Sequence, residues 1–215
     1  MAIRAVFFDA GETLFDETRL WSAWADWLGV PRLTLLALLG AVLARGEHHA
    51  QVFELLRPGI DVERERAARE AAGDATGFEA VDLYPDARPC LETLGGAGFR
   101  IGIAGNYSPQ SERTIREMEL PVDVVGGSAG WGVEKPAPGF FARVLDASGV
   151  RADEIAYVGD RVDNDVGPAT AAGMAAIHVR RGPWGYLQAD GAAAAGARAR
   201  IDSLAELPGV LSALV

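Results

Sequence analysis

Short apolar segments alternate with segments of helical length along most of the chain, and this alternation restricts the fold more than any other feature. It repeats several times after residue 82, and a first apolar segment stands near the N-terminus. Strands that alternate with helices of about 10–12 residues form βαβ units and therefore a parallel sheet. Predicted strands are residues 3–8, 99–104, 122–125, 155–158 and 174–179, and predicted helices are residues 90–94, 109–119, 138–148 and 165–172.

A segment of different character interrupts this alternation after the first strand. Residues 16–82 show no strand pattern, and their apolar residues recur at helical spacing. We therefore predict an α/β fold, a doubly wound parallel sheet in a Rossmann-like core at 1–15 and 83–215, with an all-helical domain at 16–82. Residues 189–200 are of low complexity and are expected to form a surface loop. The final segment is expected to be a helix or turn broken at Pro208.

Composition limits the classes of protein to which this chain can belong. Hydrophobic residues make up 49% and charged residues 23% of its 215 residues, as in globular proteins. The formal net charge is −10 and no cluster of basic residues is present, so we expect no nucleic-acid partner. A small phosphorylated molecule stays compatible with the sequence. No pattern in the sequence indicates the oligomeric state.

Targeting and cysteine content favour a cytoplasmic protein. Cys90 is the only cysteine, which excludes an internal disulfide and a cysteine metal cluster. The chain enters its first strand without the pattern of a signal peptide. The longest apolar run, residues 33–44, is shorter than the roughly 20 residues that cross a bilayer, so we expect no membrane span.

Polar residues stand where the predicted strands end. Asp9 follows the first strand, Gly105 and Asn106 follow the second, and Asp160 follows the fourth, with Asp165 close behind. Each residue alone could cap a helix or a turn, but neighbouring parallel strands are about 4.8 Å apart, so these strand ends are expected to meet. Carboxylates brought together raise one another's pKa unless a cation lies between them. Mg²⁺ prefers such oxygen ligands, so the pattern predicts a metal site.

One basic residue differs from all the others. Of the 20 basic residues, 19 are arginine and one is Lys135, which lies in a loop before a predicted helix. An ammonium group beside the carboxylates would keep a nucleophilic carboxylate ionised and would hold the oxygens of a phosphoryl group. A lone lysine among arginines indicates a position where a guanidinium group fails.

Four segments resemble, in order, the four motifs of the haloacid dehalogenase-like (HAD) hydrolase superfamily. FFDAGETL resembles the first motif, IGIAGN the second, EKPAPGFF the third and YVGDRVDND the fourth, in its GD-x4-D form. The resemblance extends over about residues 3–179. The predicted helical domain resembles the helical cap that one subgroup of the family inserts after its first motif.

The resemblance implies a Mg²⁺-dependent phosphatase that acts on a small phosphorylated metabolite. Asp9 would be the nucleophile that forms an aspartyl-phosphate intermediate, and Lys135 would orient it. The implied ligands of the Mg²⁺ cofactor are Asp9, the carbonyl group of Gly11, Asp160 and Asp165. The implied phosphate-binding positions are Ala10, Gly11, Thr13, Gly105, Asn106 and Lys135.

Two positions depart from the family's pattern. Phosphatases of the family place an acid/base aspartate two residues after the nucleophile, where this chain has Gly11. General acid–base catalysis contributes about 10²–10⁴-fold, so turnover is expected to be slow or restricted to good leaving groups such as acyl and aryl phosphates. Glu12 is a possible acid/base substitute, although the side chains of adjacent residues diverge. Gly105 replaces a serine or threonine, with the loss of one hydrogen bond to the phosphoryl group.

Alternative functions stay open from the sequence alone. A metal-independent 2-haloacid dehalogenase also lacks the aspartate at the Gly11 position, but the metal-type GD-x4-D motif argues against it. Phosphonate cleavage in this family needs a lysine in the cap, and residues 16–82 contain none. A catalytically weak or inactive protein that binds a ligand or a partner is the alternative outside the enzymes.

Overall fold

The computed structural model describes residues 2–74 and 77–214. Positions 75 and 76 belong to the predicted helical domain, and positions 1 and 215 to the ends of the predicted core, so the predictions for these four residues lie outside the described part. The chain forms two compact units, Met1–Asp16 with Glu79–Val215 and Glu17–Phe78. They are called the α/β unit and the helical unit below.

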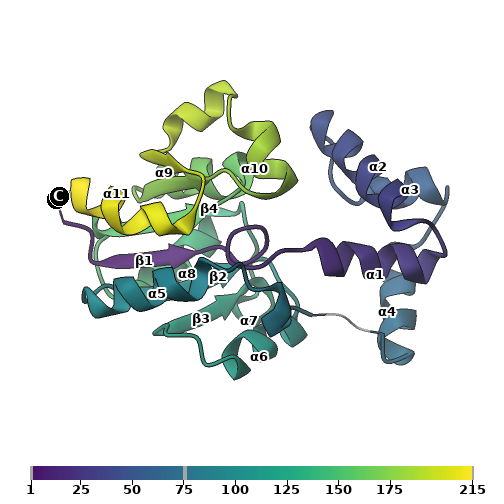
Figure 1. The fold of residues 1–215 in the computed structure, drawn as a ribbon, viewed down its shortest axis with the longest axis horizontal. Helices are drawn as coiled ribbons and strands as arrows, with labels where there is room; N and C mark the ends of the chain where they lie inside the picture. The colour runs from purple at the N-terminus through teal and green to yellow at the C-terminus, as the bar shows by residue number, and fades with distance from the viewer. Residues whose placement is uncertain (1, 75–76, 215) are drawn as a thin grey trace. The chain divides into compact units, whose positions relative to one another are not determined.

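The α/β unit contains a six-stranded parallel sheet with the strand order β3-β2-β1-β4-β5-β6 (Figure 1). In the interior of the sheet, β1 pairs in parallel with β2 on one side and with β4 on the other. The chain builds outward to β3 and then returns to β4, so the predicted doubly wound sheet is confirmed, and its switch point lies beside β1. The strands are β1 (Ala5–Phe8), β2 (Arg100–Gly105), β3 (Val124–Gly127), β4 (Ile155–Gly159), β5 (Ala175–Val179) and β6 (Ala199–Ile201).

Buried side chains cover both faces of the central strand, which explains why the residues of β1 are all apolar. Phe7 packs in a cluster with Phe140 and Phe141 of α8 on one face. Val6 and Phe8 point to the opposite face, because side chains alternate along a strand. The helices of this unit are α5 (Ala87–Gly96), α6 (Pro109–Glu117), α7 (Ser128–Trp131), α8 (Pro138–Ser148), α9 (Gly167–Ala171), α10 (Gly182–Gln188) and α11 (Leu207–Ala213).

Three predictions for the α/β unit hold only in part. The expected surface loop contains a 3₁₀ turn at Ala192–Gly196 and the edge strand β6, which pairs with β5. Pairing to an existing sheet edge overrides the weak local pattern. Pro208 does not break the last helix but lies in the first turn of α11, where its missing N–H costs nothing. The helix expected from residue 165 begins instead as a π-helical turn at Val162–Val166 that leads into α9.

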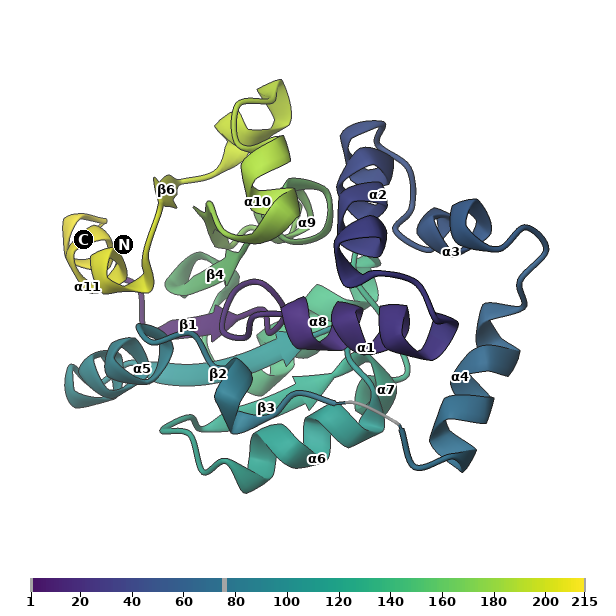
Figure 2. The same cartoon turned by 45° about the vertical axis from the view of Figure 1, so that its right-hand side comes forward.

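The helical unit contains α1 (Thr18–Leu28), α2 (Arg32–Ala44), α3 (Gln51–Leu56) and α4 (Val62–Ala71), shown in Figure 2. Trp24 of α1 lies edge-on to Phe53 of α3 at 4.8 Å, and the Arg69 guanidinium of α4 lies 4.3 Å from the Trp24 ring centroid. Trp27 donates a hydrogen bond to Glu65. These aromatic residues therefore tie α1 to α3 and α4.

The length and apolar character of a helix decide whether it could cross a membrane. No single helix in residues 2–74 and 77–214 has sufficient length and apolar character. Helices α1 and α2 reach the required length only when taken together, across a bend of 116°.

Candidate active site

The segment after β1 forms a tight turn that leaves two backbone amides free. Asp9 N–H donates to the Val158 carbonyl of β4, and the amides of Thr13, Leu14 and Phe15 all donate to the Ala10 carbonyl. Within the described part of the chain, the amides of Ala10 and Gly11 donate no hydrogen bond. These two amides are therefore available to an anion beside Asp9. The Thr13 side chain is fully buried, and its hydroxyl oxygen has no hydrogen-bond partner among the described residues.

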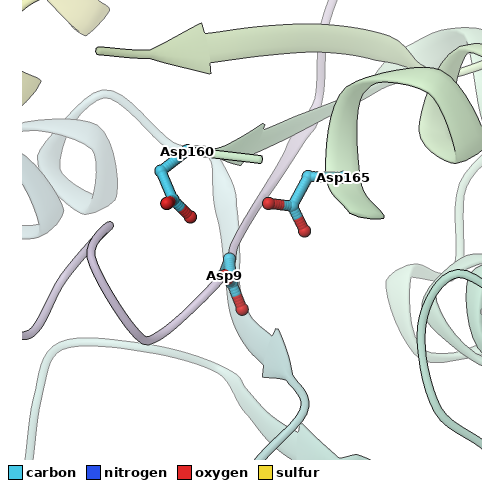
Figure 3. Close-up of side chains that lie close together, drawn as sticks. All are labelled: Asp9, Asp160 and Asp165. Carbon is cyan, nitrogen blue, oxygen red and sulfur yellow. The ribbon is translucent and has the colours of Figure 1, made fainter. Parts of the chain in front are cut away.

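Three carboxyl groups meet beside this turn (Figure 3). Asp9 follows β1, Asp160 follows β4, and Asp165 lies in the π-helical turn. Each offers one oxygen within 4.8 Å of the others, and the three residues are 7%, 1% and 0% exposed. The strand-end pattern thus brings together the three aspartates that the sequence singles out.

Lys135 completes the cluster from the loop before α8. Its Nζ lies 2.7 Å from Asp9 Oδ1 and 2.5 Å from Asp165 Oδ1, and its side chain is 1% exposed. The ammonium also lies 5.9 Å and 5.7 Å from the ring centroids of Phe140 and Tyr157. The lone lysine of the sequence is therefore a fully buried bridge between two carboxylates.

Asn106 holds the backbone of Lys135 in place. Its Nδ2 donates to the Lys135 carbonyl at 2.9 Å, and its Oδ1 accepts from the Lys135 N–H at 2.8 Å. Its side chain is thus committed to the loop that carries the lysine. This role of Asn106 was not predicted from the sequence, because Asn106 and Lys135 are 29 positions apart.

Burial and neighbouring charges shift the pKa values of three groups in the cluster, Asp160, Asp165 and Lys135. Burial and the neighbouring carboxylates of Asp165, Asp9 and Glu12 raise the pKa of Asp160 well above its usual value. Burial also raises the pKa of Asp165 to about 6, against the opposing effect of Lys135. Although burial acts in the other direction, the two carboxylates beside Lys135 raise its pKa well above 10.5. When all four groups are ionised, the cluster carries a formal charge of −2.

A hard divalent cation fits this arrangement. Asp160 Oδ2 is buried and has no hydrogen-bond partner among the described residues, an arrangement that is costly unless a ligand occupies it. The oxygens of an octahedral Mg²⁺ site are about 2.9–4.2 Å apart, which the three aspartates can reach with small adjustments. The Asp165 carboxylate is less available to a cation, because its oxygens accept hydrogen bonds from Lys135 Nζ and the Arg161 N–H.

Two glycines are required by the close approach of the carboxyl groups. A Cβ atom at Gly159 would lie 2.4 Å from the Asp165 carboxyl carbon, and one at Gly105 would lie 2.5 Å from Asp9 Oδ1. The Asp9 carboxylate thus occupies the space that a serine or threonine at position 105 would need. Gly105, which departs from the family's second motif, therefore leaves room for the Asp9 carboxylate.

Glu12 is buried, and its carboxylate is held by a second group of residues. It has a left-handed backbone with φ of 52°, and its Oε2 accepts a 2.7 Å hydrogen bond from the Tyr84 hydroxyl. The Arg181 guanidinium lies 4.1 Å from the Tyr84 ring centroid and donates to the Thr13 carbonyl at 2.9 Å. Tyr84 and Arg181, which no motif indicated, therefore brace the turn after Asp9.

Known proteins share both the sequence pattern and this fold. The chain matches the family of haloacid dehalogenase-like hydrolases over residues 3–173. The glyceraldehyde 3-phosphate phosphatase of Methanopyrus kandleri is 30% identical, over 85% of this chain and 86% of that protein. The phosphoglycolate phosphatase of Vibrio vulnificus is 28% identical, over 95% and 94%.

A solved structure with the same fold carries a different activity. The L-2-haloacid dehalogenase from Xanthobacter autotrophicus, with chloropropionic acid covalently bound, matches with a TM-score of 0.65 at 21% identity. The match covers 99% of this chain and 100% of that one, and it shows a shared fold. The family match spans most of the chain and includes every residue of the acidic cluster, so this chain belongs to the haloacid dehalogenase-like hydrolases and is an enzyme of that family.

Proposed function

We propose that this enzyme is a Mg²⁺-dependent phosphatase of small phosphorylated metabolites, with Asp9 as its nucleophile. The observation that carries the proposal is the buried cluster itself, in which Lys135 bridges Asp9 and Asp165 while an oxygen of Asp160 stays without a partner among the described residues. The 30% identity to a glyceraldehyde 3-phosphate phosphatase supports a phosphorylated substrate.

The residues of the cluster suit two successive displacements at phosphorus. An Asp9 oxygen attacks the phosphorus atom, and the bond from phosphorus to the leaving oxygen breaks with its electron pair on that oxygen. Water then attacks the phosphorus of the aspartyl phosphate and releases a proton to solvent, the bond to Asp9 breaks with its electron pair on the carboxylate, and phosphate leaves. Lys135 stabilises the negative charge of the phosphoryl oxygens, and the free amides of Ala10 and Gly11 donate to them.

The metal would be held by Asp9, Asp160 and the Gly11 carbonyl, with Asp165 in support. When bound, Mg²⁺ supplies positive charge that offsets the carboxylates and the phosphoryl oxygens. The residues of the chain then orient the Asp9 carboxylate. Because Asp9 is buried, bulk water is kept away from the flanks of this carboxylate.

Removal of the metal tests the proposal directly. We expect phosphate release from acetyl phosphate and p-nitrophenyl phosphate in 5 mM Mg²⁺ and a loss of at least about 10²-fold in EDTA, because Asp160 would stay unpaired. Excess Mg²⁺ should restore the activity. Chloride release from 2-chloropropionate, measured in parallel with and without EDTA, separates the dehalogenase alternative. Metal-independent chloride release without phosphate release would overturn the proposal.

The leaving group is expected to control the rate. Since position 11 has no side chain to donate a proton, aryl and acyl phosphates should turn over at least about 10²-fold faster than glycerol phosphate at saturating Mg²⁺. The Glu12 carboxylate already accepts from Tyr84, so Glu12→Gln should change this ratio less than about threefold. A selective loss of alkyl phosphate turnover in Glu12→Gln would instead identify Glu12 as the proton donor.

A further inference from the structure

A buried histidine of β5 holds the backbone of Asp160 from outside the acidic cluster. His178 is 0% exposed, and its Nε2 lies 2.9 Å from the Asp160 carbonyl oxygen. A carbonyl oxygen only accepts, so Nε2 carries the proton and donates. Burial lowers the pKa of His178, which agrees with a neutral ring. Nδ1 therefore carries the lone pair, and it has no partner among the described residues.

Asp160 needs such a restraint more than the other two aspartates do. The carboxylates of Asp9 and Asp165 are fixed by Lys135, and that of Asp165 also by the Arg161 N–H. The Oδ2 atom of Asp160 has no partner in the described part of the chain. Asp160 also lies beyond the last residue of β4, where the strand no longer fixes the peptide.

The sheet brings the histidine to the peptide that it binds. Gly159, the last residue of β4, pairs with His178 in the parallel ladder between β4 and β5. The imidazole can therefore reach the carbonyl of Asp160, the residue that follows β4. An aliphatic side chain at this buried position would avoid the cost of an unpaired ring nitrogen, so filling the core does not account for a histidine here.

We propose that His178 is a positioning residue of the metal site, which fixes the Asp160 peptide so that the free carboxylate stays directed at Asp9 and Asp165 (Figure 3). The inference rests on the proposed function, because it requires Asp160 to bind Mg²⁺. Residues that orient metal ligands from behind contribute about 10–100-fold to metal affinity. Loss of the donor leaves the Asp160 carbonyl without its hydrogen bond and its peptide free to turn.

The test compares two amide side chains of different length, glutamine and asparagine, at position 178. The amide nitrogen of glutamine can take the place of imidazole Nε2, whereas that of asparagine is too short. We expect His178→Gln to bind Mg²⁺ within about threefold of the unmodified protein, and His178→Asn and His178→Met to bind about 10-fold more weakly. Affinity is measured by calorimetric titration of Mg²⁺ without substrate, so the readout does not depend on turnover. Ile177→Val, the adjacent buried position of β5, is the matched control and should leave the affinity unchanged.

Each result separates this inference from the proposed function. Equal Mg²⁺ affinity in folded His178→Asn and His178→Gln would overturn the positioning role and leave the phosphatase proposal intact. An unmodified protein that binds no Mg²⁺ would overturn both. Thermal unfolding of each variant without metal identifies the folded ones. If His178→Met does not fold, the comparison between glutamine and asparagine still decides.

Discussion

Asp9→Asn is expected to abolish phosphate release, with a loss of at least about 10³-fold in kcat, because an amide cannot form the aspartyl phosphate. The variant should fold, since the new side chain has almost the same volume and its amide oxygen can still accept from Lys135 Nζ, which lies 2.7 Å from Asp9 Oδ1. Activity is measured on acetyl and p-nitrophenyl phosphate at saturating Mg²⁺. Acid quenching during turnover of the unmodified enzyme should trap protein-bound phosphate that hydroxylamine releases, and Asp9→Asn should trap none.

Asp163→Asn is the matched control for this loss. It makes the same chemical change within the same acidic segment, but the Asp163 side chain is 55% exposed and pairs with Arg161 rather than with the cluster. We expect Asp163→Asn to keep at least about half of the activity, as is usual for exposed substitutions away from a site. A residual activity above about a tenth in Asp9→Asn would exclude Asp9 as the nucleophile.

The convergence of the aspartates was predictable because topology alone brings them together. In a doubly wound parallel sheet, the residues that follow β1 and β4 must meet at the same edge, whatever the path of the loops. Asp9 and Asp160 follow these two strands, and Asp165 stands one turn further along. The position of an acidic cluster could therefore be inferred before any side chain was placed.

The supporting contacts could not be predicted, because they depend on how loops return to the sheet. Asn106 binds the backbone of Lys135 across 29 residues, and His178 binds that of Asp160 across 18. No local pattern marks an asparagine or a histidine for a contact with a distant peptide. The edge strand β6 was missed for a related reason, since its pairing with β5 and not its composition makes it a strand.

Lys135→Arg is expected to inactivate the enzyme although the charge is conserved. The Lys135 side chain is 1% exposed, its Nζ lies within 2.7 Å of two carboxylates, and the rings of Phe140 and Tyr157 lie beside it. A guanidinium is longer and planar, so it would displace the Asp9 carboxylate or the surrounding core, and such overpacking costs about 1–3 kcal/mol. We expect kcat on p-nitrophenyl phosphate to fall about 10²–10³-fold, as for the loss of one donor to a developing charge.

The control is the reverse exchange, from arginine to lysine, at an exposed position. It shows whether exchanging the two residues changes activity by itself, through charge or helix propensity. Arg143→Lys lies on the exposed side of α8 and should keep full activity, because lysine and arginine are interchangeable where the side chain only faces solvent. Lys135→Met tests the charge by itself and should lose at least as much activity as Lys135→Arg, since the carboxylates then lack their cation. Lys135→Arg with more than half of the kcat would mean that the site accepts a guanidinium. The presence of one lysine beside 19 arginines would then have no explanation in the geometry of this site.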